Sequence, residues 1–201
     1  MTAAANATGG RPAPAPGEEA SAALALVNTR LLAGDQQYDL IASAPRAGAW
    51  LAERGLLADG AAAGDGDGAR LRTLREQIRS LFAAQAAGIV PAPDVLAAFN
   101  QALALTPSVA ALNWDDAGPR RDQRPVAPAA DPVGTALTQL AADALAVLTS
   151  GDGRVPAPCG AHGCIRWFLR THAARQWCSD RCGDRVRAAR HYARRHPAAE
   201  V

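Results

Sequence analysis

Apolar residues recur at helical spacing along most of the chain between residues 21 and 153. The clearest stripe lies on a predicted helix that Gly88 and Pro91 end. Its apolar face is formed by Leu71, Leu74, Ile78, Leu81, Phe82 and Gln85. The opposite, polar face carries Arg72, Arg75, Glu76 and Arg79. This pattern predicts an amphipathic helix that buries one face in the core of a helical domain.

Two shorter helices are expected before this one. Leu24, Val27 and Leu31 recur at helical spacing and predict a first helix, which Gly34 closes. The second begins at the Ser43-Ala44-Pro45 segment, because proline is favoured in the first turn of a helix, and it runs to residue 54.

Two further helices are expected after it. Asp94 is the predicted N-cap of the fourth helix. The inward-facing residues of that helix are Leu96, Phe99 and Leu103. The pair Asp131-Pro132 is typical of an N-cap followed by proline at the first helical position, and the helix that it begins runs to Ser150.

Three segments lack helical periodicity. Residues 108–126 predict a β-hairpin, because SVAALNW is apolar and β-compatible and DDAGPRRD is rich in turn formers. Residues 1–20 contain almost no large apolar side chain, so they are expected to be disordered. The glycine-rich residues 59–69 are expected to form a flexible loop. No apolar run approaches the roughly 20 residues of a membrane span, so no membrane partner is expected.

All four cysteines lie close together near the C-terminus, at Cys159, Cys164, Cys178 and Cys182. The spacing C-x4-C-x13-C-x3-C supplies two thiol pairs separated by a loop, as a tetrahedral Zn²⁺ site requires. Disulfides are disfavoured because the N-terminal residues lack the features of a signal peptide, which also makes the cytoplasm the expected location. An iron–sulfur site and unrelated buried thiols remain as alternatives, and His162 could replace one cysteine.

A basic helix is predicted after the last cysteine. Residues 183–196 read GDRVRAARHYARRH and stop before Pro197. Val186, Ala189 and Ala193 are expected to face the cysteine knuckle. A cysteine pair at the start of a helix, after a first knuckle and a hairpin, is the layout of a treble-clef finger. The segment from 164 to 178 is expected to supply that hairpin, with Trp167, Phe168 and Trp177 as a small apolar core.

The predicted fold class is therefore mainly α. A helical N-terminal domain with a small β-hairpin spans residues 21–153, and a treble-clef-like zinc finger spans residues 154–197. A finger of about 40 residues buries little surface, so metal binding must contribute to its folding.

Charge divides the chain into two parts, and all 21 basic residues are arginine. Residues 1–153 hold 11 arginines against 16 acidic residues, a net charge of −5, whereas residues 154–201 hold 10 against 3, a net charge of +7. An arginine-rich helix beside a zinc knuckle predicts contact with a phosphate backbone, and the alternative is a solvated basic face. The expected DNA-contacting residues are Arg185, Arg187, Arg190, Arg194 and Arg195.

The C-terminal segment resembles the CGNR zinc finger family. The likeness rests on WCSDRC, from Trp177 to Cys182, and on CGDR, from Cys182 to Arg185. Asp184 stands where the family motif has asparagine, the loop between the knuckles is shorter than usual, and the last cysteine pair is one residue tighter. The resemblance implies DNA binding by a finger whose zinc is held by the four cysteines.

Three upstream segments are similar to the ABATE domain of stress-induced transcription regulators. They are Leu24 to Ile41, Ala49 to Leu57 and Leu71 to Phe82. The resemblance implies a sensing or dimerising domain, with a small-molecule effector and a second copy of the chain as expected partners. Asn28 and Arg75 are candidate ligand-binding residues in these segments, although Asn28 could simply bond a neighbouring turn and Arg75 could be solvated.

Catalytic motifs are not found in the sequence, and no enzymatic activity is expected. There is no Gly-rich phosphate loop and no HExxH, and all four histidines lie in the cysteine-containing segment. Two functions remain. The first is a zinc-containing transcriptional regulator that binds double-stranded DNA. The alternative is a non-catalytic, zinc-dependent interaction module that binds an acidic protein partner.

Overall fold

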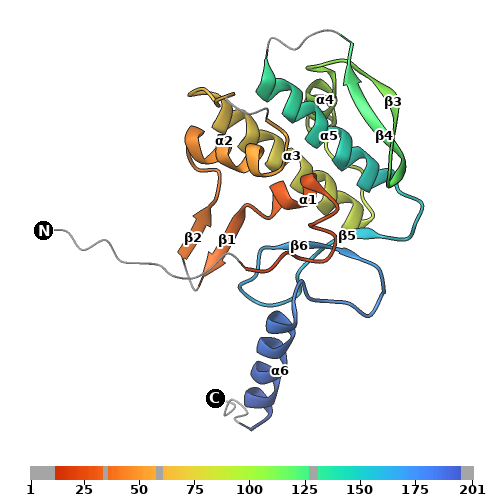
Figure 1. The fold of residues 1–201 in the computed structure, drawn as a ribbon. Coiled ribbons are helices and arrows are strands. Elements are labelled where there is room, and N and C mark those ends of the chain that lie inside the picture. The colour runs from red at the N-terminus through yellow and green to blue at the C-terminus, as the bar shows by residue number, and fades with distance from the viewer. Residues whose placement is uncertain (1–11, 34–35, 58–60, 127–130, 196–201) are drawn as a thin grey trace, which may run out of the picture.

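The computed structural model describes residues 12–33, 36–57, 61–126 and 131–195 (Figure 1). The elements in these ranges, in chain order, are α1 Ala22–Val27, β1 Arg30–Ala33, β2 Gln36–Asp39, α2 Ala44–Glu53, α3 Asp67–Ala87, α4 Pro93–Ala104, β3 Ser108–Asp115, β4 Gly118–Pro125, α5 Pro132–Thr149, β5 Val155–Pro158, β6 Trp167–Arg170 and α6 Asp180–Arg195. The strands form three separate antiparallel pairs, β1–β2, β3–β4 and β5–β6. Within the described ranges, no helix combines the length and the apolar character needed to cross a bilayer.

Helix α3 lies at the centre of the helical body, where it contacts α1, α2, α4 and α5. Its predicted apolar face is confirmed for the apolar residues, because Leu74, Ile78 and Phe82 are all buried in the main core. Gln85, which was assigned to the same face, is exposed. The predicted end of the helix is also confirmed. Gly88 follows the last turn with a φ of 66°, the left-handed conformation in which glycine carries no side-chain penalty.

The first predicted helix is too long, because the chain leaves α1 after Val27 and forms the strand pair β1–β2. The Thr29 hydroxyl donates to the Leu26 carbonyl at 2.7 Å. The Thr29 carbonyl accepts from the Leu40 amide at 3.0 Å, which continues the strand pairing. Leu31 fits the apolar spacing of a helix, but it lies in β1. A single apolar residue at that spacing is equally compatible with a short strand, so the pattern alone did not distinguish the two. The expected stop, Gly34, lies outside the described residues.

Helix starts depend on local capping, and one of the two predicted N-caps is confirmed. Asp131 caps α5, where its Oδ1 accepts from the Gly134 amide at 2.8 Å. Asp94 does not cap α4, because Pro93 begins that helix and Ala92 occupies the N-cap position. Asp94 instead lies in the first turn, where a negative charge is favourable to the helix dipole.

The predicted β-hairpin is confirmed as β3 and β4. Its register runs from Ser108 opposite Pro125 to Asp115 opposite Gly118. The hairpin contacts mainly itself, and it lies beside α4 and α5 in Figure 1. Trp114 is 74% exposed, so this hairpin presents apolar side chains to solvent.

The expected disorder of residues 1–20 is wrong for residues 12–20. Ala15 and Glu18 are buried, and the Leu169 amide donates to the Pro16 carbonyl at 2.8 Å. Backbone hydrogen bonds and one buried carboxylate hold this segment, and neither depends on large apolar side chains. Residues 1–11 lie outside the described residues.

The glycine-rich segment 59–69 is partly helical, contrary to the expected loop. Helix α3 begins at Asp67, whose Oδ2 accepts from the Gly64 amide at 2.7 Å. Gly68 packs against the start of α2, where an added Cβ would lie 3.4 Å from the Ala44 amide nitrogen. Residues 58–60 lie outside the described residues.

The C-terminal elements β5, β6 and α6 follow the helical body, and β5 contacts α3. The finger hairpin differs from the prediction, because β6 pairs with β5, which precedes Cys159. Side chains alternate along β6, so Trp167 and Leu169 join the main core while Phe168 packs with the cysteines. The Trp167 ring lies 6.0 Å from the Phe82 ring of α3, measured between centroids. The finger therefore shares a core with the body.

Candidate metal centre

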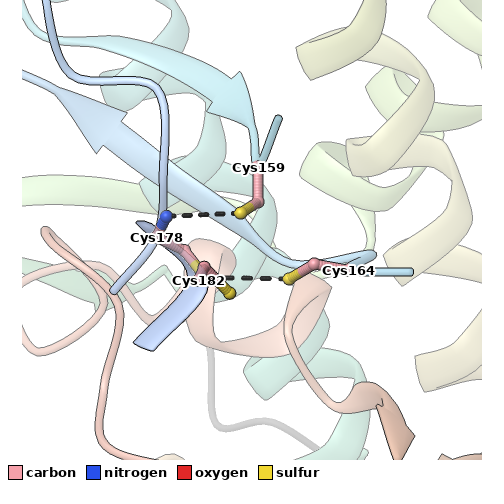
Figure 2. Close-up of side chains that lie close together, drawn as sticks. All are labelled: Cys159, Cys164, Cys178 and Cys182. Carbon is pink, nitrogen blue, oxygen red and sulfur yellow. Dashed lines mark hydrogen bonds between the residues drawn. The ribbon is translucent and has the colours of Figure 1, made fainter. Parts of the chain in front are cut away.

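The four cysteine side chains point toward one another (Figure 2), and their sulfur atoms all lie within 4.8 Å of each other. The Cys178 sulfur is 3.7 Å from the sulfur of Cys164 and 3.7 Å from that of Cys182. A tetrahedral ion with metal–sulfur bonds of about 2.3 Å holds its sulfur ligands about 3.8 Å apart. The structure thus brings the predicted ligand set together at the spacing that Zn²⁺ requires.

The first cysteine pair is positioned by a turn that follows β5. The Cys159 amide donates to the Arg166 carbonyl at 2.9 Å, and the Cys164 amide donates to the Ala161 carbonyl at 3.0 Å. Gly163 lies inside this turn with a φ of 69°. The two bonds fold residues 159–164 into a compact knuckle.

The second pair is held against this knuckle by backbone groups. The Cys178 amide donates to the Cys159 sulfur at 3.4 Å. The Gly160 amide donates to the Gln176 carbonyl at 2.9 Å. An amide that donates to sulfur stabilises the thiolate form, as metal binding requires.

Cys182 lies in the first turn of α6, close to Ser179 and Arg185. Its amide donates to the Ser179 hydroxyl at 3.3 Å, which supports the start of the helix. The Arg185 guanidinium lies 3.9 Å from the Cys182 sulfur. The helix N-terminus and this arginine both favour a negative sulfur atom.

The thiols share protons unevenly in the absence of a cation. Hydrogen bonds from Cys164 and Cys178 lower the pKa of Cys159. The hydrogen bond to Cys159 raises the pKa of Cys164 to about 11, and hydrogen bonds to Cys159 and Cys164 raise the pKa of Cys178. Because ionised sulfur atoms this close repel one another, a bound dication and thiol ionisation favour each other.

Two of the competing interpretations of the cysteines, disulfides and replacement by His162, fit less well. All four are free, and the 3.7 Å sulfur separations are far longer than the roughly 2.05 Å of a disulfide. His162 is exposed and does not belong to the sulfur cluster. The four cysteines are the candidate ligands.

Two family profiles match the chain. The CGNR zinc finger matches residues 157–195. ABATE, described as "Putative stress-induced transcription regulator", matches residues 20–151. The chain belongs to the ABATE family. Both resemblances seen in its short motifs are thereby confirmed, and zinc is the metal of its finger. A sequence search of curated proteins gives no match.

Asn28 joins the ABATE domain to the finger. Its Oδ1 accepts from the Trp167 amide at 2.8 Å, and its Nδ2 donates to the Trp167 carbonyl at 2.9 Å. The same Nδ2 donates to Glu18 at 2.9 Å, and the side chain is 3% exposed. Asn28 was a candidate ligand-binding residue, and the structure places it in a buried contact with β6.

A buried ion pair adjoins this contact. Arg166 Nη2 lies 2.7 Å from Glu18 Oε2, and the two side chains are 9% and 7% exposed. The same Nη2 donates to the Ala13 carbonyl at 2.9 Å. The sequence pattern predicts a role for neither residue, since Glu18 lies in a segment without large apolar side chains. An arginine between a cysteine and the apolar run Trp167–Leu169 is the one signal that could have indicated Arg166.

Arg75, the second candidate ligand-binding residue, is buried rather than solvated. It binds both oxygens of Asp39 at 2.8 Å and donates to the Thr29 hydroxyl at 2.9 Å. Burial raises the pKa of Asp39, but the hydrogen bond from Arg75 and further contacts outweigh burial, so the pKa is lowered overall. Arg75 therefore attaches the β1–β2 hairpin to α3. Ligand contact by Asn28 and Arg75 stays a prediction.

The predicted DNA-contacting arginines are all exposed on α6, which points away from the body in Figure 1. From residue 187 to residue 195 every side chain is exposed. Val186 is partly buried against the knuckle, but Ala189 and Ala193, which were expected to face it, are exposed. The knuckle covers only the beginning of the helix, because α6 continues beyond the cysteine cluster.

The arginines of α6 differ in their surroundings. Arg187 donates to Asp184 at 2.6 Å and lies 5.7 Å from the centre of the Trp177 ring. Arg190 and Arg194 have no ion-pair partner among the described residues, and the same holds for Arg195. The distal part of α6 is thus the least neutralised part of the finger.

Proposed function

We propose that this ABATE protein is a cytoplasmic, non-enzymatic transcription regulator that binds double-stranded DNA through α6. The projection of an arginine-rich helix from the zinc centre is the observation that carries this proposal. The helical ABATE domain then serves as the sensing or dimerising part.

The geometry of α6 suits the major groove. Its 16 residues extend about 24 Å, and the major groove, about 12 Å wide, admits one helix. Arg187, Arg190 and Arg194 lie at positions i, i+3 and i+7, so they share one face. We assign Arg187 and Arg190 to base edges, and Arg194 and Arg195 to phosphates.

In this proposal the zinc ion has a structural role. A first cysteine knuckle, followed by a cysteine pair at the start of a helix, supports a treble-clef arrangement. Four thiolates close the coordination sphere of Zn²⁺ and leave no position for a substrate. The ion then sets the angle at which α6 leaves the body. A second copy of the chain would place two such helices on successive half-sites.

A salt titration of duplex binding tests the proposal. Arg194→Ala together with Arg195→Ala should weaken binding to all sequences alike and lower the slope of log affinity against log salt by about one to two units. Arg120→Ala with Arg121→Ala is the matched control, because it removes two neighbouring arginines from β4. Unchanged affinity and slope in the α6 variant would reject α6 as the contact surface.

Removal of zinc is the second arm of the test. The chelated protein should lose duplex affinity, and restored zinc should return it, because the ion holds α6 in place. If the zinc-loaded protein binds no duplex but binds an acidic polypeptide in a salt-dependent way, the protein-interaction alternative replaces DNA binding.

A further inference from the structure

The β3–β4 hairpin is a two-stranded sheet with little support from the rest of the chain. Within the described ranges β3 pairs with β4 alone, and the hairpin contacts mainly itself. Large apolar side chains of β3 are nonetheless exposed, Val109 by 56%, Leu112 by 68% and Trp114 by 74%. A lone hairpin is at best marginally stable in water, and clustered exposed apolar side chains are typical of binding surfaces. The hairpin therefore has the character of an interaction surface.

The two strands of the hairpin differ in how they are protected against further pairing. β4 carries Arg120, Arg121 and Arg124, and its Pro119 has no amide hydrogen to donate. Charged side chains and proline are what natural proteins use to keep the edge of a sheet from pairing. The seven residues 108–114 of β3, SVAALNW, contain neither a charge nor a proline. The edge of β4 is thus protected, whereas the edge of β3 is not.

The register shows which backbone groups lie at the β3 edge. The Val126 amide donates to the Pro107 carbonyl at 2.9 Å, so the pair that precedes Ser108 opposite Pro125 is hydrogen-bonded. Hydrogen-bonded and non-hydrogen-bonded pairs alternate along an antiparallel ladder. The odd-numbered residues of β3 therefore bond to β4. The N–H and C=O groups of Ala110, Leu112 and Trp114 point the other way, to the outer edge.

We propose that the β3 edge pairs, antiparallel, with the β3 edge of a second copy of the chain, so that two hairpins form one four-stranded sheet. An uncharged strand of matching length is the complement that this edge requires, and residues 108–114 of a second copy supply it. A two-fold axis through Ala111 lays the two uncharged runs side by side over their whole length. Ala110 then lies opposite Leu112 of the second copy, and Val109 lies opposite Asn113 of the second copy.

This pairing ends at two copies. A contact about a two-fold axis uses the same surface on both chains and closes the assembly. Both β4 strands lie at the outer edges of the four-stranded sheet, where their arginines and Pro119 oppose the addition of further strands. The inference rests on the dimerising role proposed for the ABATE domain, and it names the surface that performs it. It does not depend on DNA contact by α6.

Sedimentation equilibrium of the zinc-loaded full chain, without DNA, tests the proposal. The wild-type protein should pass from one copy to two as its concentration rises to about 100 μM, where weak specific complexes form. Leu112→Lys and Val109→Lys should each raise the dissociation constant of the dimer at least about tenfold, because each places a charge in the interface twice. Val90→Lys is the matched control, since Val90 is 86% exposed and lies outside the hairpin, and it should leave the dissociation constant unchanged.

The two β3 variants distinguish pairing through the edge from stacking through one face. Val109 and Leu112 lie on opposite faces of the strand, and pairing through the edge involves both. A loss of association in only one of them would overturn the proposal, as would wild-type association in both. Assemblies of more than two copies would also overturn it, because the β4 edge would then pair as well. A wild-type protein that stays monomeric at about 100 μM would leave the edge to a strand of another protein.

Amide hydrogen exchange of the wild-type protein gives a result that needs no variant. The Ala110 and Leu112 amides should exchange more slowly at a concentration that favours the dimer than in dilute solution, because they gain a backbone partner. The Arg121 amide, which faces the outer edge of β4, should exchange at the same rate in both. Equal rates for Ala110 and Leu112 at the two concentrations would overturn the proposal. A monomer that binds duplex DNA refutes this interface alone, whereas a dimer that binds no duplex refutes the DNA contact alone.

Discussion

Asn28→Ala tests whether the finger is attached to the ABATE domain by the hydrogen bonds of a single side chain. Asn28 is 3% exposed, and it bonds both the amide and the carbonyl of Trp167. Truncation leaves these two backbone groups of β6 without their partner, inside the protein and away from water. It also removes one donor from Glu18, which keeps the Ala15 amide and Arg166.

The expected cost follows from the groups left unpaired. A buried donor or acceptor without a partner costs about 1–3 kcal/mol, so the two Trp167 groups together cost about 2–6 kcal/mol of unfolding free energy. Asn28→Asp should cost at least as much. It keeps an acceptor for the Trp167 amide, but it places a second carboxylate where Nδ2 now lies 2.9 Å from Glu18.

Asn113 supplies a matched control. It also makes two side-chain hydrogen bonds, from Nδ2 to Asp122 at 2.8 Å and from Arg124 to Oδ1 at 2.7 Å. These bonds lie on the solvent-facing β3–β4 hairpin, where water replaces a lost partner. Asn113→Ala should therefore cost less than about 1 kcal/mol.

Urea unfolding at saturating zinc, followed by circular dichroism, measures these differences. Elemental analysis should show the same zinc content in each variant, because Asn28 does not contact the cysteines. A loss below about 1 kcal/mol for Asn28→Ala, or one no larger than that of Asn113→Ala, would refute the attachment of the finger through Asn28.

Three more outcomes are expected. The protein should contain about one zinc per chain by elemental analysis, and Cys178→Ser with Cys182→Ser should remove it; full occupancy in the double variant would contradict the site. Ile78→Ala should cost about 2–5 kcal/mol in urea unfolding, since the side chain is fully buried, and a cost below about 0.5 kcal/mol would mean that this face is not core. The lowered pKa of Asp39 means that its pairing with Arg75 stabilises the protein fully above about pH 4, and that this contribution is lost as the pH falls further. The cost of Asp39→Asn should thus be smaller at pH 3 than at pH 7, and equal costs would argue against the pairing.

The parts of the fold that sequence predicts are those with a strong local signal. The stripe through Leu74 and Ile78 is long enough to distinguish a helix from a strand. The Asp131-Pro132 pair marks the start of α5 because its chemistry acts within one turn. By contrast, Leu31 follows a short stripe, and its place in β1 depends on pairing with β2 and on the attachment of Asp39 to Arg75.

The metal site also has a strong local signal in the sequence, whereas the contacts that surround it do not. The four cysteines are recognised from spacing alone, since zinc geometry demands two close pairs. The ion pair of Glu18 with Arg166 joins residues 148 positions apart, so no local pattern reports it. The strand partner of β6 is also not local, because β5 lies on the other side of the first knuckle.

Strand β6 connects the zinc centre to the stability of the whole molecule. Phe168 packs with the cysteines, whereas its neighbours Trp167 and Leu169 pack in the helical core. A strand cannot move one face without the other, because successive side chains belong to the same rigid backbone. We therefore expect a change that loosens the knuckle to disturb the contact of Trp167 with Phe82. The finger and the ABATE domain are thus packed together through the two faces of β6.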